Sequence, residues 1–153
     1  MKIYKFQRKQ LFKTSLDKLW EYLSSPKNLD DITLKELKFK ITSELPVKMY
    51  AGQLIVYKIQ ILPFLNRTWV TEIKNVIDME YFIDEQRFGP YKFWHHQHKL
   101  EKSGNNVIMH DFIHYAIPFG ILGQILNFFF IRKKLENIFQ YRFDYLDKKF
   151  NGK

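Results

Sequence analysis

The C-terminal part of this sequence constrains the fold most, because a long helical pattern follows a series of strand patterns. From Ile121 to about Phe150, apolar residues recur at spacings of three and four, which is the period of one helix face. A helix of that size would be about 45 Å long, at about 1.5 Å per residue. One helix cannot cover a flat sheet made of all the preceding strands. We therefore expect a strongly curved sheet that wraps around the helix and leaves a space between the two.

The predicted elements follow one another as a strand, two short helices, six strands and the long helix. The strands are expected at residues 3–12, 37–43, 53–62, 67–77, 81–87, 92–102 and 107–117, and the short helices at 15–24 and 26–32. Thr14 or Ser15 offers an N-cap for the first short helix. Short loops between successive strands favour antiparallel pairing. The fold class is therefore α+β, with a seven-stranded curved antiparallel sheet around the terminal helix.

The apolar face of the long helix is expected to fill the interior of the curved sheet. Its members are Leu122, Ile125, Phe128, Ile131, Leu135, Ile138, Tyr145 and Leu146. This face is interrupted by Arg142, a charge where an apolar residue is expected. One interpretation is a cation in a cavity that pairs with an anionic ligand. The other is a salt bridge to Asp84 or Asp111, or a side chain that reaches solvent.

Length and composition favour one domain over residues 1–153 in a reducing environment. The chain has 153 residues and no cysteine, which excludes disulfides and thiolate chemistry. The N-terminal residues lack the continuous apolar stretch of a signal peptide. The most apolar run, Phe119 to Ile131, is too short to span a bilayer and contains Gln124 and Asn127. We therefore expect a cytoplasmic protein.

The charge does not point to a specific macromolecular partner. The formal net charge is +9, which favours acidic partners such as nucleic acid or an anionic membrane. The basic residues are spread along the whole chain, however, and no recognition helix or base-stacking platform stands out. A solvated basic surface is the favoured interpretation. No nucleic-acid partner is predicted, and the oligomeric state is left open.

Two neighbouring strands carry an unusual mixture of side chains on one face. A turn at residues 88–91, with Gly89-Pro90, joins the strands at 81–87 and 92–102. Alternate residues of a strand share a face. One face therefore collects Phe82, Asp84, Gln86, Trp94, His96, His98 and Leu100. A plain core face would be apolar throughout, and a mixed inward face is what a ligand cavity needs.

The succession of motifs resembles a known family. The matching stretches are residues 19–20, 26–29, 49–52, 69–73, 82–86, 89–91, 94–98, 109–111, 115–118 and 138–142. They resemble the START/Bet v 1-like superfamily, also called SRPBCC, and within it a bacterial branch of ligand-binding SRPBCC domain proteins. The resemblance covers essentially the whole chain. Residues 32–35, Ile-Thr-Leu-Lys, depart from the Ile-Thr-Pro-Pro-like stretch usual there, which puts the local path in doubt.

The resemblance implies a helix-grip fold and a ligand cavity, but no particular reaction. The superfamily includes lipid carriers, aromatic polyketide cyclases and hormone receptors, so fold alone leaves function open. The cavity would be lined by Trp69, Asp84, Gln86, Trp94, His96, His98, Asp111, Tyr115 and Arg142. We expect a non-enzymatic carrier of a hydrophobic small molecule, such as a lipid, an isoprenoid or a polyketide-like compound. The alternative is a buried polar network that only fixes strand register.

Two chemical hypotheses use the same histidines. In the first, His96-x-His98 and Asp111 form a metal site of the two-histidine, one-carboxylate kind. An acid after a His-x-His strand, here Glu101, also echoes a cupin site, but its spacing is one residue short and a long terminal helix does not suit that fold. No metal or cofactor is therefore predicted.

The second hypothesis is a cyclase- or hydrolase-type enzyme in which His96, His98 or Asp111 performs general acid–base catalysis. The sequence contains no nucleophile elbow, phosphate loop or cofactor fingerprint. Catalysis is therefore the alternative to the carrier.

Three consecutive phenylalanines, Phe128 to Phe130, precede the basic residues Arg132, Lys133 and Lys134. Three consecutive residues cannot all face one side of a helix, so at least one should be partly exposed. This pattern suggests transient contact with an anionic membrane; the alternative is that the rings fill the interior of the sheet.

All these face assignments depend on strand register. A slip by one residue would turn Glu72, Glu85, His95 and His110 inward instead.

Overall fold

The computed structural model describes residues 1–62 and 65–152, without the side chains of residues 61 and 62. The strands are β1 (Tyr4–Phe12), β2 (Lys40–Ile41), β3 (Leu54–Leu62), β4 (Leu65–Ile77), β5 (Tyr81–Phe88), β6 (Phe93–Ser103) and β7 (Asn106–Ala116). The helices are α1 (Leu16–Leu23), two 3-10 turns η1 (Pro26–Leu29) and η2 (Lys35–Leu37), α2 (Gly120–Leu126), a π-helical segment η3 (Asn127–Ile131), and α3 (Arg132–Asn151).

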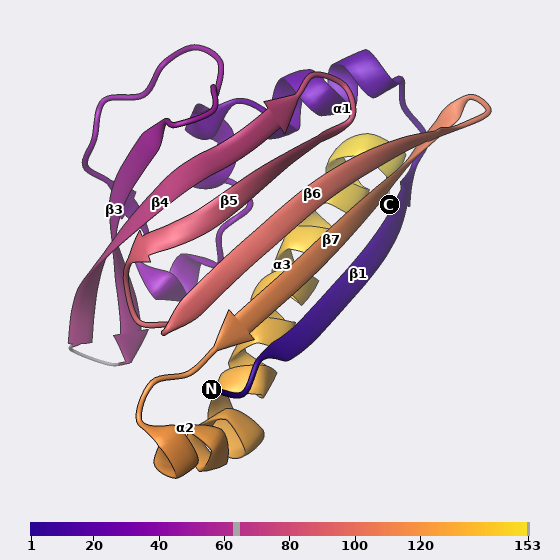
Figure 1. Cartoon of the computed structure of the whole chain (residues 1–153). Coiled ribbons are helices and arrows are strands. Elements are labelled where there is room, and N and C mark those ends of the chain that lie inside the picture. Colours follow the sequence, from indigo (N-terminus) through magenta and orange to yellow (C-terminus); the bar gives the residue numbers. More distant parts are fainter. Residues whose placement is uncertain (63–64, 153) are drawn as a thin grey trace.

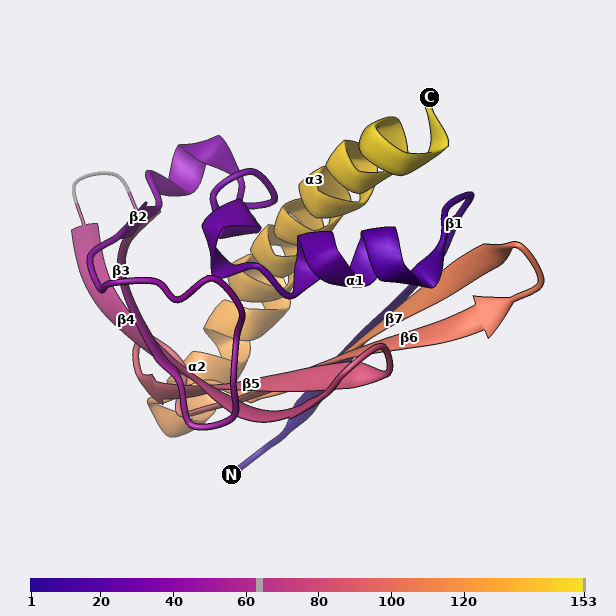
Figure 2. The same cartoon turned by 90° about the horizontal axis from the view of Figure 1, so that it is seen from above.

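The strands form one antiparallel sheet in the order β1-β7-β6-β5-β4-β3-β2. Figure 1 shows α3 crossing one face of this sheet, behind β6, β7 and β1. Seen from above in Figure 2, the sheet bends around α3, with α1 crossing the open side. The predicted α+β helix-grip architecture, with seven strands and a long C-terminal helix, is confirmed.

The strand register turns the predicted face inward. His98 lies opposite Asp111 across β6 and β7, and Asp84 lies opposite His96 across β5 and β6. Burial alternates along β7, where the odd-numbered residues from Val107 to Tyr115 are all buried. The slipped register, which would bury the neighbouring acids and histidines, does not occur.

The segment after α1 differs from the prediction in two places. The second short helix is only a 3-10 turn, Pro26–Leu29, although it was expected to continue to about residue 32. The strand expected at 37–43 is only Lys40–Ile41. The first residue of the expected strand belongs instead to the 3-10 turn η2, and Lys38 follows with a left-handed backbone at φ 43°. Alternating side chains predict a strand wherever they occur, but this turn delays the pairing with β3.

The first half of the predicted apolar helix face is not buried. Leu122 is 61% exposed and Phe128 74% exposed, whereas α3 buries Leu135, Phe139 and Leu146. Figure 1 gives the reason, because α2 lies beyond the end of the sheet, close to the N-terminus. Periodicity predicts which residues share a face, but it does not say where the opposing layer ends. In the described part of the chain, no helix is both long and apolar enough to cross a membrane.

Two apolar clusters fill the space between the sheet and the helices. One gathers around α1 and includes Leu19, Trp20 and Phe82. The other lies toward β3 and β4 and includes Trp69, Trp94 and Phe139, among others. Between them lies a group of charged side chains, since His98 stacks on Phe82 with ring centroids 4.1 Å apart and His96 meets Phe139 edge-on at 5.4 Å.

Candidate functional site

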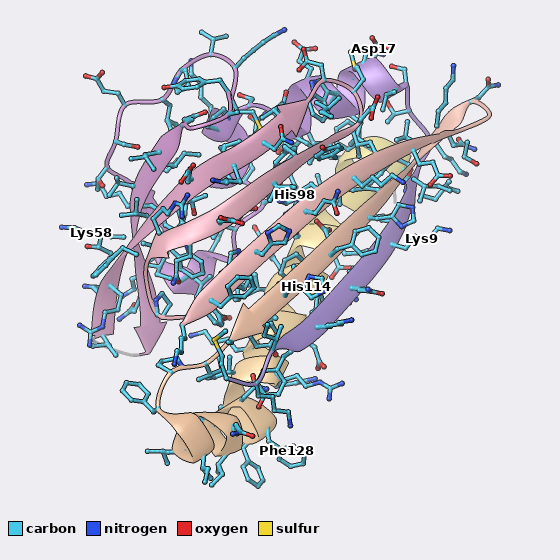
Figure 3. The ribbon with its side chains drawn as sticks, viewed as in Figure 1. Lys9, Asp17, Lys58, His98, His114 and Phe128 are labelled. Atoms are coloured by element: carbon cyan, nitrogen blue, oxygen red, sulfur yellow. The ribbon has the colours of Figure 1, made fainter. Side chains whose placement is uncertain are left out.

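Five side chains from four elements form what we call the charged cluster: Asp84 on β5, His96 and His98 on β6, Asp111 on β7 and Arg142 on α3. Figure 3 shows His98 midway along β6, where the strand crosses α3. Both histidines and Asp111 are buried, and the Asp84 and Arg142 side chains are 17% and 11% exposed. The cluster therefore lies inside the grip.

Each histidine has one ring nitrogen near Asp84 and the other near Asp111. His96 approaches Asp84 Oδ2 with Nδ1 at 3.3 Å and Asp111 Oδ1 with Nε2 at 2.8 Å. His98 approaches the same two oxygens with its nitrogens reversed, Nε2 at 2.8 Å from Asp84 and Nδ1 at 3.1 Å from Asp111. The two carboxylates thus lie on either side of the two adjacent imidazoles, whose planes are tilted by 39°.

The environment shifts the pKa values of the two histidines in opposite directions. Burial opposes charge on the His96 imidazole, but Asp84 and Asp111 outweigh it and raise its pKa. Burial also lowers the pKa of His98, and the neighbouring His96 and Arg142 charges add to that effect. We therefore assign His96 as the imidazolium, donating from both nitrogens, and His98 as the neutral ring.

This protonation state gives every charge in the cluster a partner. The neutral His98 donates from Nε2 to Asp84 and accepts at Nδ1 from Arg142 Nη2, 3.2 Å away. Arg142 Nη1 lies 3.9 Å from Asp111 Oδ1. The two carboxylates are balanced by the His96 imidazolium and the Arg142 guanidinium. Burial would raise the pKa of both carboxyls, but these partners hold both well below their usual range.

Arg142 thus interrupts the apolar helix face because it faces the charged cluster. The predicted salt bridge to Asp111 is present as a long ion pair, and the closer partner is His98. One further atom, Arg142 Nε, is buried without a hydrogen-bond partner.

An aromatic wall borders the cluster on the side of β3 and β4. Its members are Tyr57, Trp69, Tyr91, Trp94 and Tyr115. Trp94 joins the wall to the cluster, since its indole Nε1 donates to Asp84 Oδ1 at 3.1 Å. Trp69 meets Trp94 edge-on at 5.5 Å, but its own Nε1 is buried without a partner.

The structure places Gln86 apart from the charged cluster. Its side chain donates to the Tyr91 carbonyl at 2.7 Å and accepts from the Tyr91 backbone N–H at 3.1 Å. A Cβ at Gly89 would come within 2.4 Å of Gln86 Oε1, so the turn needs glycine there. The contacts of Gln86 therefore hold the β5–β6 turn and place the Tyr91 ring in the aromatic wall.

Tyr115 also reaches a residue that the sequence interpretation did not select. Its hydroxyl donates to Asn127 Oδ1 at 3.1 Å, and Asn127 is buried in η3. An amide within a strongly apolar run was the available signal, because such a group is buried only with a partner. The pair ties the start of the helical region to the end of β7.

Four buried side-chain nitrogens have no hydrogen-bond partner in the described part of the chain. They are Arg8 Nη1, Gln53 Nε2, Trp69 Nε1 and Arg142 Nε. All four are donors, and no side-chain oxygen is in this state. A buried donor without an acceptor costs about 1–3 kcal/mol, so a water or a ligand oxygen that accepts from such a donor would be stabilising.

Among the described residues, Asp84, His96 and His98 form a group that could hold a metal ion, since each offers a ligand atom within 4.8 Å of the others. The sequence hypothesis named Asp111 as the third ligand; the geometry groups Asp84 instead. Asp111 would then accept from the outer ring nitrogens, a familiar second layer around metal sites. A divalent ion would, however, displace the protons shared with Asp84 and add positive charge beside Arg142. The charge balance therefore favours the metal-free network.

The cupin-like alternative is wrong. Glu101 lies on the outer face of the sheet, where its side chain is 57% exposed and pairs with His110 at 3.5 Å. It cannot join His96 and His98 on the inner face.

Two surface pockets lie away from the charged cluster. One, of about 190 Å³, is lined by residues of β1, the β5–β6 turn and α2, among them Lys2, Tyr4 and Lys92. The other, of about 260 Å³, lies between β1 and α3 near Lys9 and Phe143.

Comparison with known proteins matches the fold but not the sequence. No protein-family model matches the chain, and no curated protein matches it in sequence. A solution structure from Arthrobacter aurescens is 11% identical with a TM-score of 0.70, covering 94% of this chain and 86% of that one. The Zhui aromatase/cyclase from Streptomyces sp. R1128 is 10% identical with a TM-score of 0.68, covering 96% of each chain. A norcoclaurine synthase point mutant from Thalictrum, in complex with a transition-state analogue, is 13% identical with a TM-score of 0.65, covering 96% of each chain.

Proposed function

We propose that this chain, which has the helix-grip fold of Bet v 1-like proteins, binds a hydrophobic small molecule between the curved sheet and α3. The ligand class is a lipid, isoprenoid or polyketide-like compound with a carbonyl, carboxylate or phenolate oxygen at one end. We propose a carrier or sensor, so binding rather than turnover is the primary activity. The narrower assignment to the bacterial ligand-binding branch stays a prediction.

The observation that carries this proposal is the set of buried donors without acceptors. Trp69 Nε1 belongs to the aromatic wall and Arg142 Nε to the charged cluster. A ligand oxygen between the wall and the cluster would accept from these groups. Its carbon skeleton would lie against the aromatic rings, where burial contributes about 25 cal/mol per Å² of apolar surface.

The charged cluster supplies the polar end of this site. Arg142 can turn toward a ligand anion at the expense of its bond to His98 and its long pair with Asp111, which leaves the two carboxylates one positive charge short. His98 would then take up a proton and donate from Nδ1 to Asp111, which lies 3.1 Å away. The cluster could thus accept an anionic head without leaving a buried charge unpaired.

Binding requires side chains to move, because the residues of the cluster are already packed. We assign this movement to the joint between the sheet and the helical region, where the end of β7 meets α2 and η3. It is held by the Tyr115–Asn127 hydrogen bond, and η3 departs from regular helix there. π-Helical segments of this kind recur at functional sites.

The test uses anilinonaphthalene sulfonate, an aromatic probe with an anionic head, titrated by fluorescence. We expect Trp69→Phe and Arg142→Gln each to raise the Kd about tenfold, the equivalent of one hydrogen bond of about 1.4 kcal/mol. Trp20→Phe is the matched control, because Trp20 lies in the other apolar cluster. Equal Kd values in all four proteins, with cooperative unfolding retained, would overturn the proposal.

The second candidate is acid–base catalysis on a bound substrate. Its specific support is the contact between a histidine with a raised pKa and one with a lowered pKa, ring centroids 3.6 Å apart, which offers an acid and a base in one site. Two of the fold neighbours are described as an aromatase/cyclase and a synthase. If a substrate is found, His98→Gln should abolish turnover while leaving its binding intact; a carrier would show no turnover in either protein.

The setting of this function is also a proposal. We place the protein in the cytoplasm as a single domain over residues 1–153, because the chain has no cysteine and its length suits one domain. Nucleic acid is not among the partners we propose.

A further inference from the structure

In the part of the chain that the structure describes, the largest group of exposed apolar side chains lies on and just before α2 and on η3. We call it the apolar knob: Phe119, Ile121, Leu122, Ile125, Leu126, Phe128, Phe129 and Phe130, whose exposed fractions run from 38% to 77%. Figure 3 shows Phe128 at the outer tip of this segment, pointing away from the sheet. Exposed apolar surface of this extent marks an interaction site.

The exposed part of the knob is apolar in several directions rather than along one stripe. Ile121 and Leu122 are exposed together, as are Phe128, Phe129 and Phe130, and consecutive residues point in different directions on a helix. A helical segment with apolar side chains in several directions needs apolar surroundings in each of them. A flat partner surface could cover only one side of it, whereas a lipid phase could surround it.

The surroundings of the knob are basic and contain few acids. No Asp or Glu occurs from residue 112 to residue 135, or from residue 1 to residue 16. Lys2 and Lys92 line the 190 Å³ pocket at the base of α2. Arg132 and Lys133 are exposed directly after the knob, with Arg132 in a surface pair with Glu136. A group of positive charges with few acids nearby is suited to an anionic membrane surface.

We infer that the apolar knob inserts into the headgroup region of an anionic lipid bilayer, with Lys2, Lys92, Arg132 and Lys133 against the lipid phosphates. Apolar side chains of a surface helix reach roughly 5–10 Å into such an interface, and basic residues add attraction to acidic lipids. A second copy of this chain is a poorer occupant, because two knobs face to face would bring both sets of basic residues together.

Docking at this place would bring the joint between β7 and α2 to the membrane. Gly123 packs so closely there that a Cβ would lie 1.9 Å from the Pro118 carbonyl. The knob is thus fixed to the end of the sheet by backbone packing and by the Tyr115–Asn127 bond. The inference stands apart from the ligand proposal, because it depends on surface residues that the interior site does not use.

The test is co-sedimentation with vesicles of phosphatidylcholine alone or mixed with phosphatidylserine, at low salt and at about 1 M salt, where the screening length is about 3 Å. We expect binding to the mixed vesicles at low salt, and little binding to pure phosphatidylcholine. Phe128→Ser and Phe129→Ser should each weaken binding about tenfold or more, because each removes an inserted ring. Lys2→Gln with Lys92→Gln should abolish the preference for phosphatidylserine.

Matched controls lie at the other end of β1. Leu11→Ser removes an exposed apolar residue there, and Lys9→Gln with Lys13→Gln removes two positive charges; both should bind as the wild type does. Binding unchanged in the phenylalanine variants would overturn the inference. Absence of vesicle binding by the wild type would also overturn it. Analytical ultracentrifugation would then show whether the protein is monomeric or associates through the knob, and either result would count against the inference. Probe binding in solution should be unchanged in Lys2→Gln with Lys92→Gln, whose residues line a surface pocket away from the interior site, so failure here and failure of the ligand proposal are distinguishable.

Discussion

His96 and His98 lie against each other with ring centroids 3.6 Å apart and contact the same two carboxylates through opposite ring nitrogens. Both rings cannot be charged at equal cost in this position, because each lies in the field of the other. The carboxylates stabilise one imidazolium, and Arg142 disfavours the second. The pair therefore divides into one charged and one neutral histidine.

This division should be visible as two separate titrations. We expect the His96 imidazole to titrate above pH 6.5 and the His98 imidazole below it. The measurement is NMR of the ring nitrogens across the pH range, assigned with His96→Gln and His98→Gln. In urea both rings should return to about 6.5. Coincident titrations in the folded protein would contradict the assigned protonation state.

The same shifts make the free energy of unfolding depend on pH in two opposite ways. His96 has a raised pKa when folded, so its contribution is complete below pH 6.5 and is lost as the pH rises through the folded value. His98 has a lowered pKa when folded, so stability falls as the pH drops from 6.5 toward that value. We expect a stability maximum near pH 6.5 by urea denaturation, with a shallower decrease on the acid side in His98→Gln. An unchanged acid side in that variant would contradict the prediction.

In Arg142→Met, protonation of His98 should replace the positive charge of the lost guanidinium. Without Arg142, burial and His96 still lower the pKa of His98, but one opposing charge is gone, so that pKa rises. At pH 8, removing one partner of a buried pair should cost about 3–5 kcal/mol; at pH 5.5 the cost should be smaller because the lower pH favours protonation of His98. Arg132→Met is the matched control, since its exposed pair with Glu136 is worth about 0–1 kcal/mol. An equal loss at both pH values would contradict this exchange.

Changing each of the two inner tryptophans to phenylalanine should lower the free energy of unfolding by different amounts. Trp94→Phe leaves Asp84 Oδ1 without its indole donor, which should cost about 1–3 kcal/mol beyond the loss of ring volume. Trp69→Phe removes a donor that has no acceptor, so it should cost less. Urea denaturation of both variants measures the difference. A larger loss in Trp69→Phe would mean that its indole already has a partner, such as a bound water.

Tyr115→Phe should loosen α2 and η3 without loosening the sheet. It leaves the buried Asn127 Oδ1 without a donor, at a cost of about 1–3 kcal/mol. Hydrogen exchange should accelerate over residues 120–131 and stay unchanged in β6. The control is Tyr4→Phe, which keeps the ring stacked on Tyr115. Equal acceleration across the whole chain would show that the bond supports global stability rather than this joint.

Strand alternation made most of the interior predictable from the sequence. The residues on the inward faces of β6 and β7 follow a two-residue period, and burial of one face fixes their register. The same reasoning placed Asp84, His96, His98 and Asp111 together, because they lie on adjacent strands. Arg142 could be predicted as an inward charge from its place in the helical pattern.

Other features depend on distances that a pattern does not contain. Gln86 shares the inward face but lies one step beyond the cluster, where the Tyr91 backbone is nearer. Leu122 and Phe128 share the helical period of Leu135, yet the sheet ends before it reaches them. The sequence hypothesis chose Asp111 as the third metal ligand, whereas the geometry places Asp84 with the two histidines. This choice depends on side-chain rotamers, which the sequence pattern does not contain.

Native mass spectrometry of the purified protein, followed by denaturation and mass analysis of what is released, tests the central proposal most directly. We predict an organic species with a carbonyl, carboxylate or phenolate oxygen, retained in Trp20→Phe and reduced in Trp69→Phe. A metal-sized increment that disappears with chelator would assign the cluster to Asp84, His96 and His98 as ligands instead. A wild-type protein with no added mass, together with a crystal structure in which ordered waters accept from Trp69 Nε1 and Arg142 Nε, would contradict ligand binding at this site.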